Sequence, residues 1–210
     1  MKQWRLSVLS LTILSLGIFA PSASLINSAH AENAPAQILR LYVKGFGGDF
    51  TLTDHHGNSF SLQEMRGKVV ILYFGYTACA DICPTTLFDV GSAMRALGPK
   101  AAQAQPLMIT IDPKRDTKDR LKAVLPYYHP SIIGLTGSEA EIEAVEKQYR
   151  ASSYIRPPDK NGFYAVDHTS HLYIIDSEGR LGYLIPFGTP PEKITQVLQE
   201  LLSQINTAQK

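Results

Sequence analysis

Two kinds of hydrophobic pattern alternate along this chain, and together they predict strands interleaved with helices. An unbroken apolar run, typical of a strand covered on both faces, occupies 69–74, and further strands are predicted at 107–111 and 132–135. Apolar residues with turn-forming centres between them predict two hairpins, 49–53 with 59–62 and 172–175 with 181–185. Helical spacing and capping residues predict helices at about 84–97, 118–125, 138–149 and 191–204.

These elements predict one α/β domain. Strands that alternate with helices, with hairpins at the edges, indicate a three-layer sandwich with a central mixed sheet, an N-terminal hairpin and flanking helices. The last helix is expected to bury an apolar stripe formed by Ile194, Val197, Leu198 and Leu201. No repeat or linker interrupts the chain after about residue 45, so we expect an N-terminal extension at 32–45 and a single domain at 46–206.

The first 31 residues have the pattern of a secretory signal. Lys2 and Arg5 precede an apolar run over 6–20, and Ala29-His30-Ala31 provides the small residues of a cleavage site. The run is shorter than the roughly 18 residues of a membrane-spanning helix. We therefore expect export after cleavage behind Ala31, most simply to a bacterial periplasm, without an integral membrane anchor. If the segment is retained, the domain would lie on the outer face of the inner membrane.

The charge balance argues against a polyanionic partner. Lys and Arg number 20 and Asp and Glu 19, for a net charge of +1 at pH 7. Neither nucleic acid nor an anionic membrane surface is therefore expected to bind.

The strongest candidates for a functional site are the only two cysteines of the chain, Cys79 and Cys83, which directly follow the predicted strand 69–74. A disulfide closing so small a loop would add little stability, so the pair suits redox exchange or metal binding better than a structural role. Their position between a strand and a helix favours a thioredoxin-like fold. Asp81, between them, is interpreted either as a helix cap or as a residue that supports the site.

A metal site would need a further donor, and the six histidines are the candidates. His30 leaves with the leader, the hairpin-turn residues His55 and His56 are expected to be solvated, and His129 is expected to face helix carbonyls; His168 and His171 remain. The residues alone leave both open. Asp167 could hydrogen-bond and orient the His168 ring.

Three motifs in order resemble those of the Sco/SenC family. They are the run 69–77 leading into Cys79-x-x-x-Cys83-Pro84, the loop 112–117 (Asp-Pro-Lys-Arg-Asp-Thr), and Asp167-His168-Thr169 before an apolar strand. The likeness covers about 46–202. One departure is Ala78 and Ala80, where many relatives have histidine and proline; this puts the rigidity of the loop in question more than its ligands.

The resemblance implies a thioredoxin-like protein that binds Cu(I) and Cu(II) through Cys79, Cys83 and His168. It implies delivery of copper to the binuclear copper site of a respiratory cytochrome oxidase, with the copper-accepting subunit as partner and other periplasmic copper chaperones or a thiol reductant as further contacts. Soft thiolates and imidazole are suitable copper donors, whereas structural zinc normally takes four protein ligands.

Two other classes of function compete with a chaperone. A thiol-disulfide oxidoreductase that keeps a partner's copper-binding cysteines reduced would use Cys79 and Cys83 without a histidine ligand. A thiol peroxidase is disfavoured because Thr77 is two residues before Cys79 rather than three, and Tyr73 stands where that class has proline.

Overall fold

Strands and helices alternate along residues 37–208, the part of the chain that this computed structural model describes. The predicted secretory leader, residues 1–31, lies outside this range. Among the described residues, no helix combines the length and apolarity needed to cross a membrane.

An eight-stranded mixed sheet forms the centre of the domain. Across it the strands run β1 (Leu39–Arg40), β10 (Leu181–Ile185), β9 (Leu172–Ile175), β4 (Val69–Gly75), β5 (Ala104–Thr110), β6 (Ile133–Thr136), β2 (Thr51–Asp54) and β3 (Ser59–Ser61). The three strands β4, β5 and β6 are parallel, and the other neighbours are antiparallel. A separate two-stranded sheet pairs β7 (Ser153–Ile155) with β8 (Val166–His168). The predicted central mixed sheet and both predicted hairpins are confirmed.

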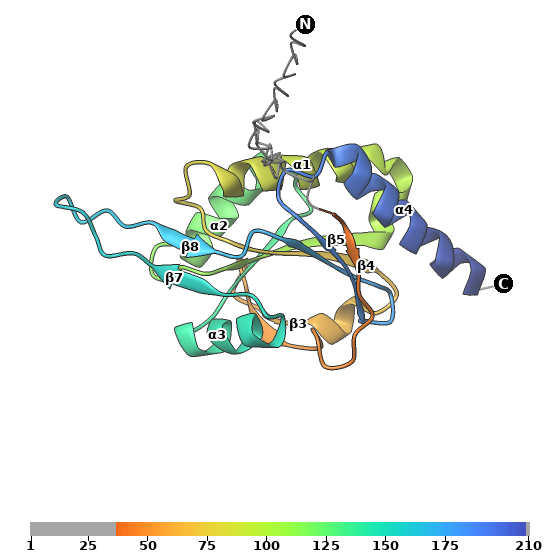
Figure 1. Cartoon of the computed structure of the whole chain (residues 1–210), viewed down its shortest axis with the longest axis horizontal. Helices are drawn as coiled ribbons and strands as arrows, with labels where there is room; N and C mark the ends of the chain where they lie inside the picture. The colour runs from red at the N-terminus through yellow and green to blue at the C-terminus, as the bar shows by residue number, and fades with distance from the viewer. Residues whose placement is uncertain (1–36, 209–210) are drawn as a thin grey trace, which may run out of the picture. The chain divides into compact units, whose positions relative to one another are not determined.

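Helices cover both faces of the sheet. The α-helices are α1 (Ile82–Ala96), α2 (Lys118–Val124), α3 (Glu139–Gln148) and α4 (Pro191–Ala208), and the 3-10 helices are η1 (Leu62–Met65), η2 (Gly98–Gln103) and η3 (Leu125–Tyr127). Figure 1 shows α1 and α4 together on one side of the sheet and α3 on the other, with β7 and β8 projecting away from it. The predicted three-layer α/β sandwich is confirmed.

The core forms where the sequence pattern places it. All seven residues of β4 are buried, as expected for a central strand covered on both faces. Helix α4 buries the predicted stripe, Ile194, Val197, Leu198 and Leu201. Ser138 and Glu141 form the predicted capping box at the start of α3.

Several element ends differ from the sequence prediction, and three of the differences concern pairing or helix geometry. Strand β5 begins at Ala104 rather than 107, although it contains Pro106; β6 pairs only from Leu107, so the missing N–H of Pro106 lies where the strand has one neighbour. Helix α1 begins two residues before Pro84, which is tolerated within a first turn. Strand β1, inside the predicted extension, pairs with β10.

The pair β7–β8 was not predicted. Each strand has only three residues, too short for an alternating pattern to stand out. His168 consequently ends a strand instead of lying in a loop.

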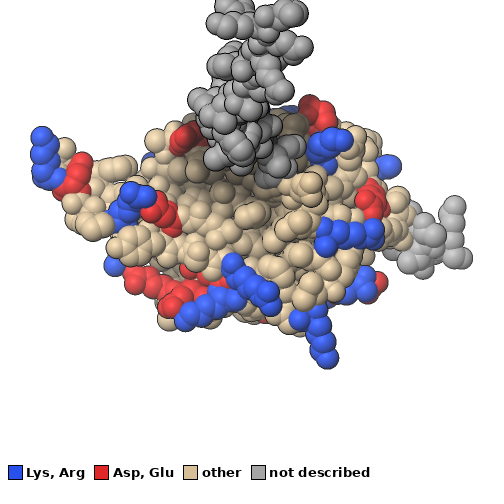
Figure 2. All heavy atoms as spheres, in the orientation of Figure 1, with Lys and Arg blue, Asp and Glu red and all other residues tan. Residues whose placement is uncertain are grey.

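The distribution of charged side chains agrees with the near-neutral composition. On the face shown in Figure 2, acidic and basic groups are interspersed around a broad area of other residues, and neither sign forms a continuous field.

Candidate metal centre

The two cysteines lie at the carboxyl end of β4, where the chain turns into α1. Cys79 is half-buried in the connecting loop, whereas Cys83 is the second residue of α1 and only 1% exposed. Both are free thiols. The loop therefore presents one sulfur to the surface and keeps the other inside.

The tertiary fold brings His168 to this pair. One ligand atom each from Cys79, Cys83 and His168 lie within 4.8 Å of one another, the only such cluster of three or more metal-binding side chains within 37–208. The Cys83 Sγ and His168 Nε2 atoms are 3.4 Å apart. The three residues that the family resemblance singles out thus share one site.

The imidazole of His168 is held in a defined orientation. Its Nδ1 lies 3.0 Å from the carbonyl oxygen of Thr169, so Nδ1 carries the proton and Nε2 presents a lone pair toward the sulfurs. The rings of Tyr73 and Tyr76 meet it edge-on, with centroids at 6.1 and 5.9 Å. Burial lowers the pKa of His168 and so favours the neutral, metal-binding form.

The two thiols differ in acidity because their surroundings differ. Burial raises the pKa of Cys83 to about 12, and the nearby Tyr73 hydroxyl offsets this rise only in part. For Cys79 burial also opposes ionisation, but hydrogen bonds from the backbone N–H groups of Asp81 and Cys83 outweigh it and lower the pKa. Cys79 is therefore the thiol that ionises first.

The two predicted supporting aspartates act differently from expectation. The side chain of Asp81 makes no capping hydrogen bond, and its backbone N–H supports Cys79 instead. The carboxylate of Asp167 binds Arg156 at 2.8 and 2.9 Å rather than the His168 ring. Adjacent side chains on a strand point to opposite faces, so Asp167 cannot share the direction of His168.

Within residues 37–208 the other histidines lie outside the cluster, and two of them differ from prediction. His55 is buried rather than solvated: its Nδ1 accepts the Gly134 N–H at 2.8 Å, and its Nε2 lies 2.9 Å from that of His56. His129 accepts the Ser131 N–H instead of facing helix carbonyls. His171 is half-buried between β8 and β9.

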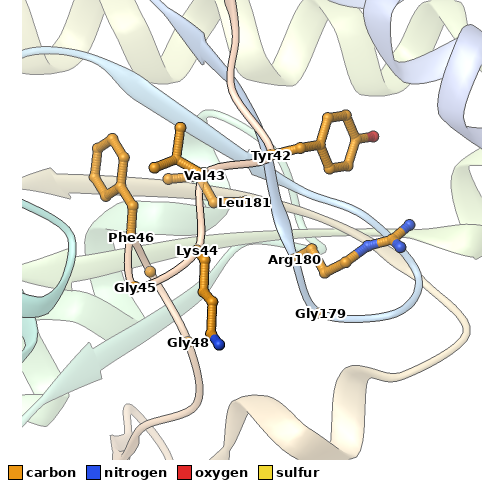
Figure 3. A pocket seen from close by; sticks show the side chains of 10 residues that line it. Tyr42, Val43, Lys44, Gly45, Phe46, Gly48, Gly179, Arg180 and Leu181 are labelled. Carbon is orange, nitrogen blue, oxygen red and sulfur yellow. The ribbon is translucent and has the colours of Figure 1, made fainter.

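A separate cavity lies at the opposite end of β4. It measures about 470 Å³ and is bordered by residues 42–48 and 179–181. Figure 3 shows Lys44 and Arg180 pointing in different directions, and Arg180 is already paired with Asp176 and Glu178. Its cationic groups do not converge on a ligand.

The donor set suits copper. Two thiolates and one imidazole combine the soft ligands preferred by Cu(I) with a nitrogen that also serves Cu(II). The buried hydroxyl of Tyr73 has no hydrogen-bond acceptor within bonding geometry, although it lies close enough to Cys83 to affect its acidity. A metal-bound Cys83 thiolate would offer that hydroxyl a charged acceptor.

Comparison with known proteins identifies the family. The SCO1/SenC family model matches residues 41–203. A SCO2-like protein of Rickettsia felis is 37% identical over 154 residues, covering 73% of this chain and 75% of its own. Protein SCO2 of Saccharomyces cerevisiae mitochondria is 43% identical over 136 residues, covering 64% and 45%.

Solved structures of the same family share the fold. Bradyrhizobium japonicum ScoI with copper bound has a TM-score of 0.69 at 36% identity, covering 74% of this chain and 99% of its own. Yeast Sco1 with copper bound has a TM-score of 0.69 at 35% identity, covering 76% and 89%. BsSco, a member of the Sco family of cytochrome c oxidase assembly proteins with a disulfide switch, has a TM-score of 0.60 at 23% identity, covering 76% and 95%, a likeness of fold. With its matched sequence, thioredoxin-like fold and Cys-Cys-His cluster, the chain belongs to the SCO1/SenC family.

Proposed function

We propose that this protein is a copper chaperone that binds copper through Cys79, Cys83 and His168 and delivers it to the copper-accepting subunit of a respiratory cytochrome oxidase. The observation that carries the proposal is the convergence of two free thiols and an oriented imidazole within 4.8 Å. Family members solved with copper bound, and one known as a cytochrome c oxidase assembly protein, support the choice of metal and partner.

Ligand exchange gives a physical route for delivery. The Cys79 sulfur is more exposed and more acidic, so a cysteine from the acceptor would replace it first, while Cys83 and His168 still hold the ion. Cys83 would follow from inside the fold. The secretory pattern of residues 1–31 supports a location of this transfer in the periplasm or at the outer face of the inner membrane, where other copper chaperones or a thiol reductant would keep the protein loaded and reduced.

Copper titration of the reduced protein tests the proposal. We expect one copper per chain and a sulfur-to-copper charge-transfer band. Cys79→Ser and Cys83→Ser should abolish tight binding. His168→Ala should alter the cupric spectrum, and His171→Ala, a nearby half-buried histidine, is the matched control. A His168→Ala variant that binds both copper states like the wild type would refute this site.

A thiol-disulfide oxidoreductase is the second candidate, favoured by the unequal acidity of the two thiols. In that reaction the Cys79 thiolate attacks a partner disulfide, forming a mixed disulfide and releasing one partner thiolate. Cys83 then attacks the Cys79 sulfur, which leaves the partner reduced and Cys79–Cys83 oxidised. Rapid reduction of a disulfide substrate, unaffected by His168→Ala and without specific copper uptake, would favour this function over the chaperone.

A further inference from the structure

The loop 112–117, between β5 and α2, supplies no ligand but contains two buried carboxylates. Asp112 is 1% exposed and Asp116 is fully buried. Carboxylates are costly to bury unless they accept strong hydrogen bonds. Both find such bonds in contacts that lead to the segments carrying the candidate copper ligands.

The first contact reaches the cysteine loop. Asp116 accepts the Thr77 N–H at 2.8 Å and the Thr77 hydroxyl through its other oxygen, and Thr110 donates to it at 2.8 Å. The Nε of Arg120 donates to the Thr77 hydroxyl at 3.1 Å. Thr77 is two residues before Cys79, so these bonds fix the backbone from which the exposed thiol projects.

The second contact reaches the strand that ends in His168. Nη1 of Arg115 donates to the Tyr164 carbonyl at 2.8 Å, and its guanidinium lies over the Tyr164 ring, 3.6 Å from the centroid. Asp112 accepts Arg115 Nε in a close ion pair and the Tyr164 hydroxyl at 3.0 Å. Tyr164 is four residues before His168, at the base of β8.

The strand carrying His168 needs such an anchor. β7 and β8 form their own two-stranded sheet, and an isolated two-stranded hairpin is only marginally stable in water. Tyr154, Ile155 and Phe163 in the segment 153–168 are exposed, and of the three residues of β8 only Val166 is buried. A metal site, in contrast, requires its donors to be held to about 0.5 Å.

We propose that loop 112–117 is a two-armed clamp, in which Asp116 positions Cys79 and Arg115 positions His168 for the same copper ion. The inference rests on the proposed copper function for its purpose, but the clamp exists in the metal-free protein. Each arm holds the backbone ahead of one ligand; the Arg115 guanidinium also lies 5.4 Å from the Tyr76 ring centroid, so loss of one arm should loosen its own ligand much more than the other. Loss of the Arg115 arm should release His168 and leave the dithiol in place.

Hydrogen exchange at two backbone amides tests the two arms of the clamp in the copper-free protein. The Val166 N–H donates to the Tyr76 hydroxyl at 3.2 Å beside the Arg115 arm, and the Thr77 N–H donates to Asp116. Arg115→Lys retains a charge for Asp112 but loses the planar stack and fork. We expect this variant to speed hydrogen exchange at Val166 roughly tenfold or more, with a much smaller change at Thr77.

The reciprocal variant and a control complete the experiment. Asp116→Asn should speed exchange at Thr77 and leave Val166 unchanged. Lys114→Ala removes an exposed side chain of the same loop that pairs with Glu139 at 2.9 Å, and it should match the wild type at both amides.

Copper binding then tests what the clamp is for. Arg115→Lys should retain one Cu(I) per chain but show the altered cupric absorption of His168→Ala, whereas Lys114→Ala should resemble the wild type. Wild-type exchange and a wild-type cupric spectrum in Arg115→Lys would overturn the proposal, as would equal loosening of both amides. If the wild type binds no copper, the proposed function fails, while arm-specific exchange in the apo protein would still support the clamp.

Discussion

The two thiols should react with an alkylating agent at very different rates. The perturbation is a short pulse of iodoacetamide on the reduced, metal-free protein at pH 7. Because the pKa of Cys83 is raised to about 12, its thiolate fraction is about one in 10⁵ at this pH. The pKa of Cys79 lies below the usual value of 9.0, so its thiolate fraction exceeds about one in 100.

Intrinsic nucleophilicity offsets part of that thousandfold difference. A thiolate of higher pKa is more reactive, with a Brønsted coefficient of about 0.4–0.5. A pKa difference of about three units therefore favours Cys83 by roughly 15- to 30-fold. Cys79 should therefore react at least about 30-fold faster, and the near-complete burial of Cys83 adds to this ratio.

Peptide mapping provides the measurement. Trypsin releases both cysteines on the peptide 69–95, and fragmentation between residues 79 and 83 locates a single label. Between pH 7 and 9 labelling at Cys83 should rise about tenfold per pH unit, whereas labelling at Cys79 should rise less steeply because its pKa is lower. Equal labelling of both cysteines at pH 7 would refute the assigned asymmetry.

Three further predictions concern stability and the role of a buried hydroxyl. His55→Leu leaves the Gly134 N–H without its acceptor and should cost about 1–3 kcal/mol in urea unfolding at pH 7.5. Burial lowers the pKa of His55, so the unfolded chain binds the proton more readily than the folded protein. The stability that His55 contributes should therefore be present above pH 6.5 and lost as the pH falls through the folded-state pKa. An equal pH dependence of the unfolding free energy in wild type and His55→Leu would contradict this reasoning. Leu198→Ala empties a fully buried site in α4 and should cost about 2–5 kcal/mol, seen as a lower Tm in calorimetry; an unchanged Tm would contradict the packing. Tyr73→Phe should leave the Tm of the apo protein within about 2 °C but weaken Cu(I) in a chelator competition, because the hydroxyl has no apo acceptor and gains Cys83; unaltered Cu(I) affinity would exclude that role.

The residues that sequence reasoning missed share one property. Thr77, Asp116, Arg115 and Tyr164 act through contacts between segments 39 to 49 residues apart. The Asp-Pro-Lys-Arg-Asp-Thr motif was visible, but local turn formation accounts for it in sequence. Only the burial of its carboxylates shows that the motif supports a site elsewhere.

The error at His55 has the same origin. A histidine in the turn Asp54-His55-His56-Gly57-Asn58 resembles a solvated turn residue, and nothing local opposes that interpretation. In the fold, β2 pairs with β6, and this brings the Gly134 amide 79 residues away in the chain to the imidazole. Side-chain direction on β8 likewise separated Asp167 from His168.

What the sequence alone determined about this protein follows from local physical chemistry. Apolar runs, helical periodicity, capping residues and the position of two cysteines after a strand depend on neighbouring residues, so the alternating α/β architecture and the dithiol were predictable. The choice between His168 and His171, the unequal acidity of the thiols and the support from loop 112–117 depended on the tertiary structure. These properties arise from burial and from bonds between segments distant in the chain, and only packing of the whole domain sets which groups lose water and which atoms meet.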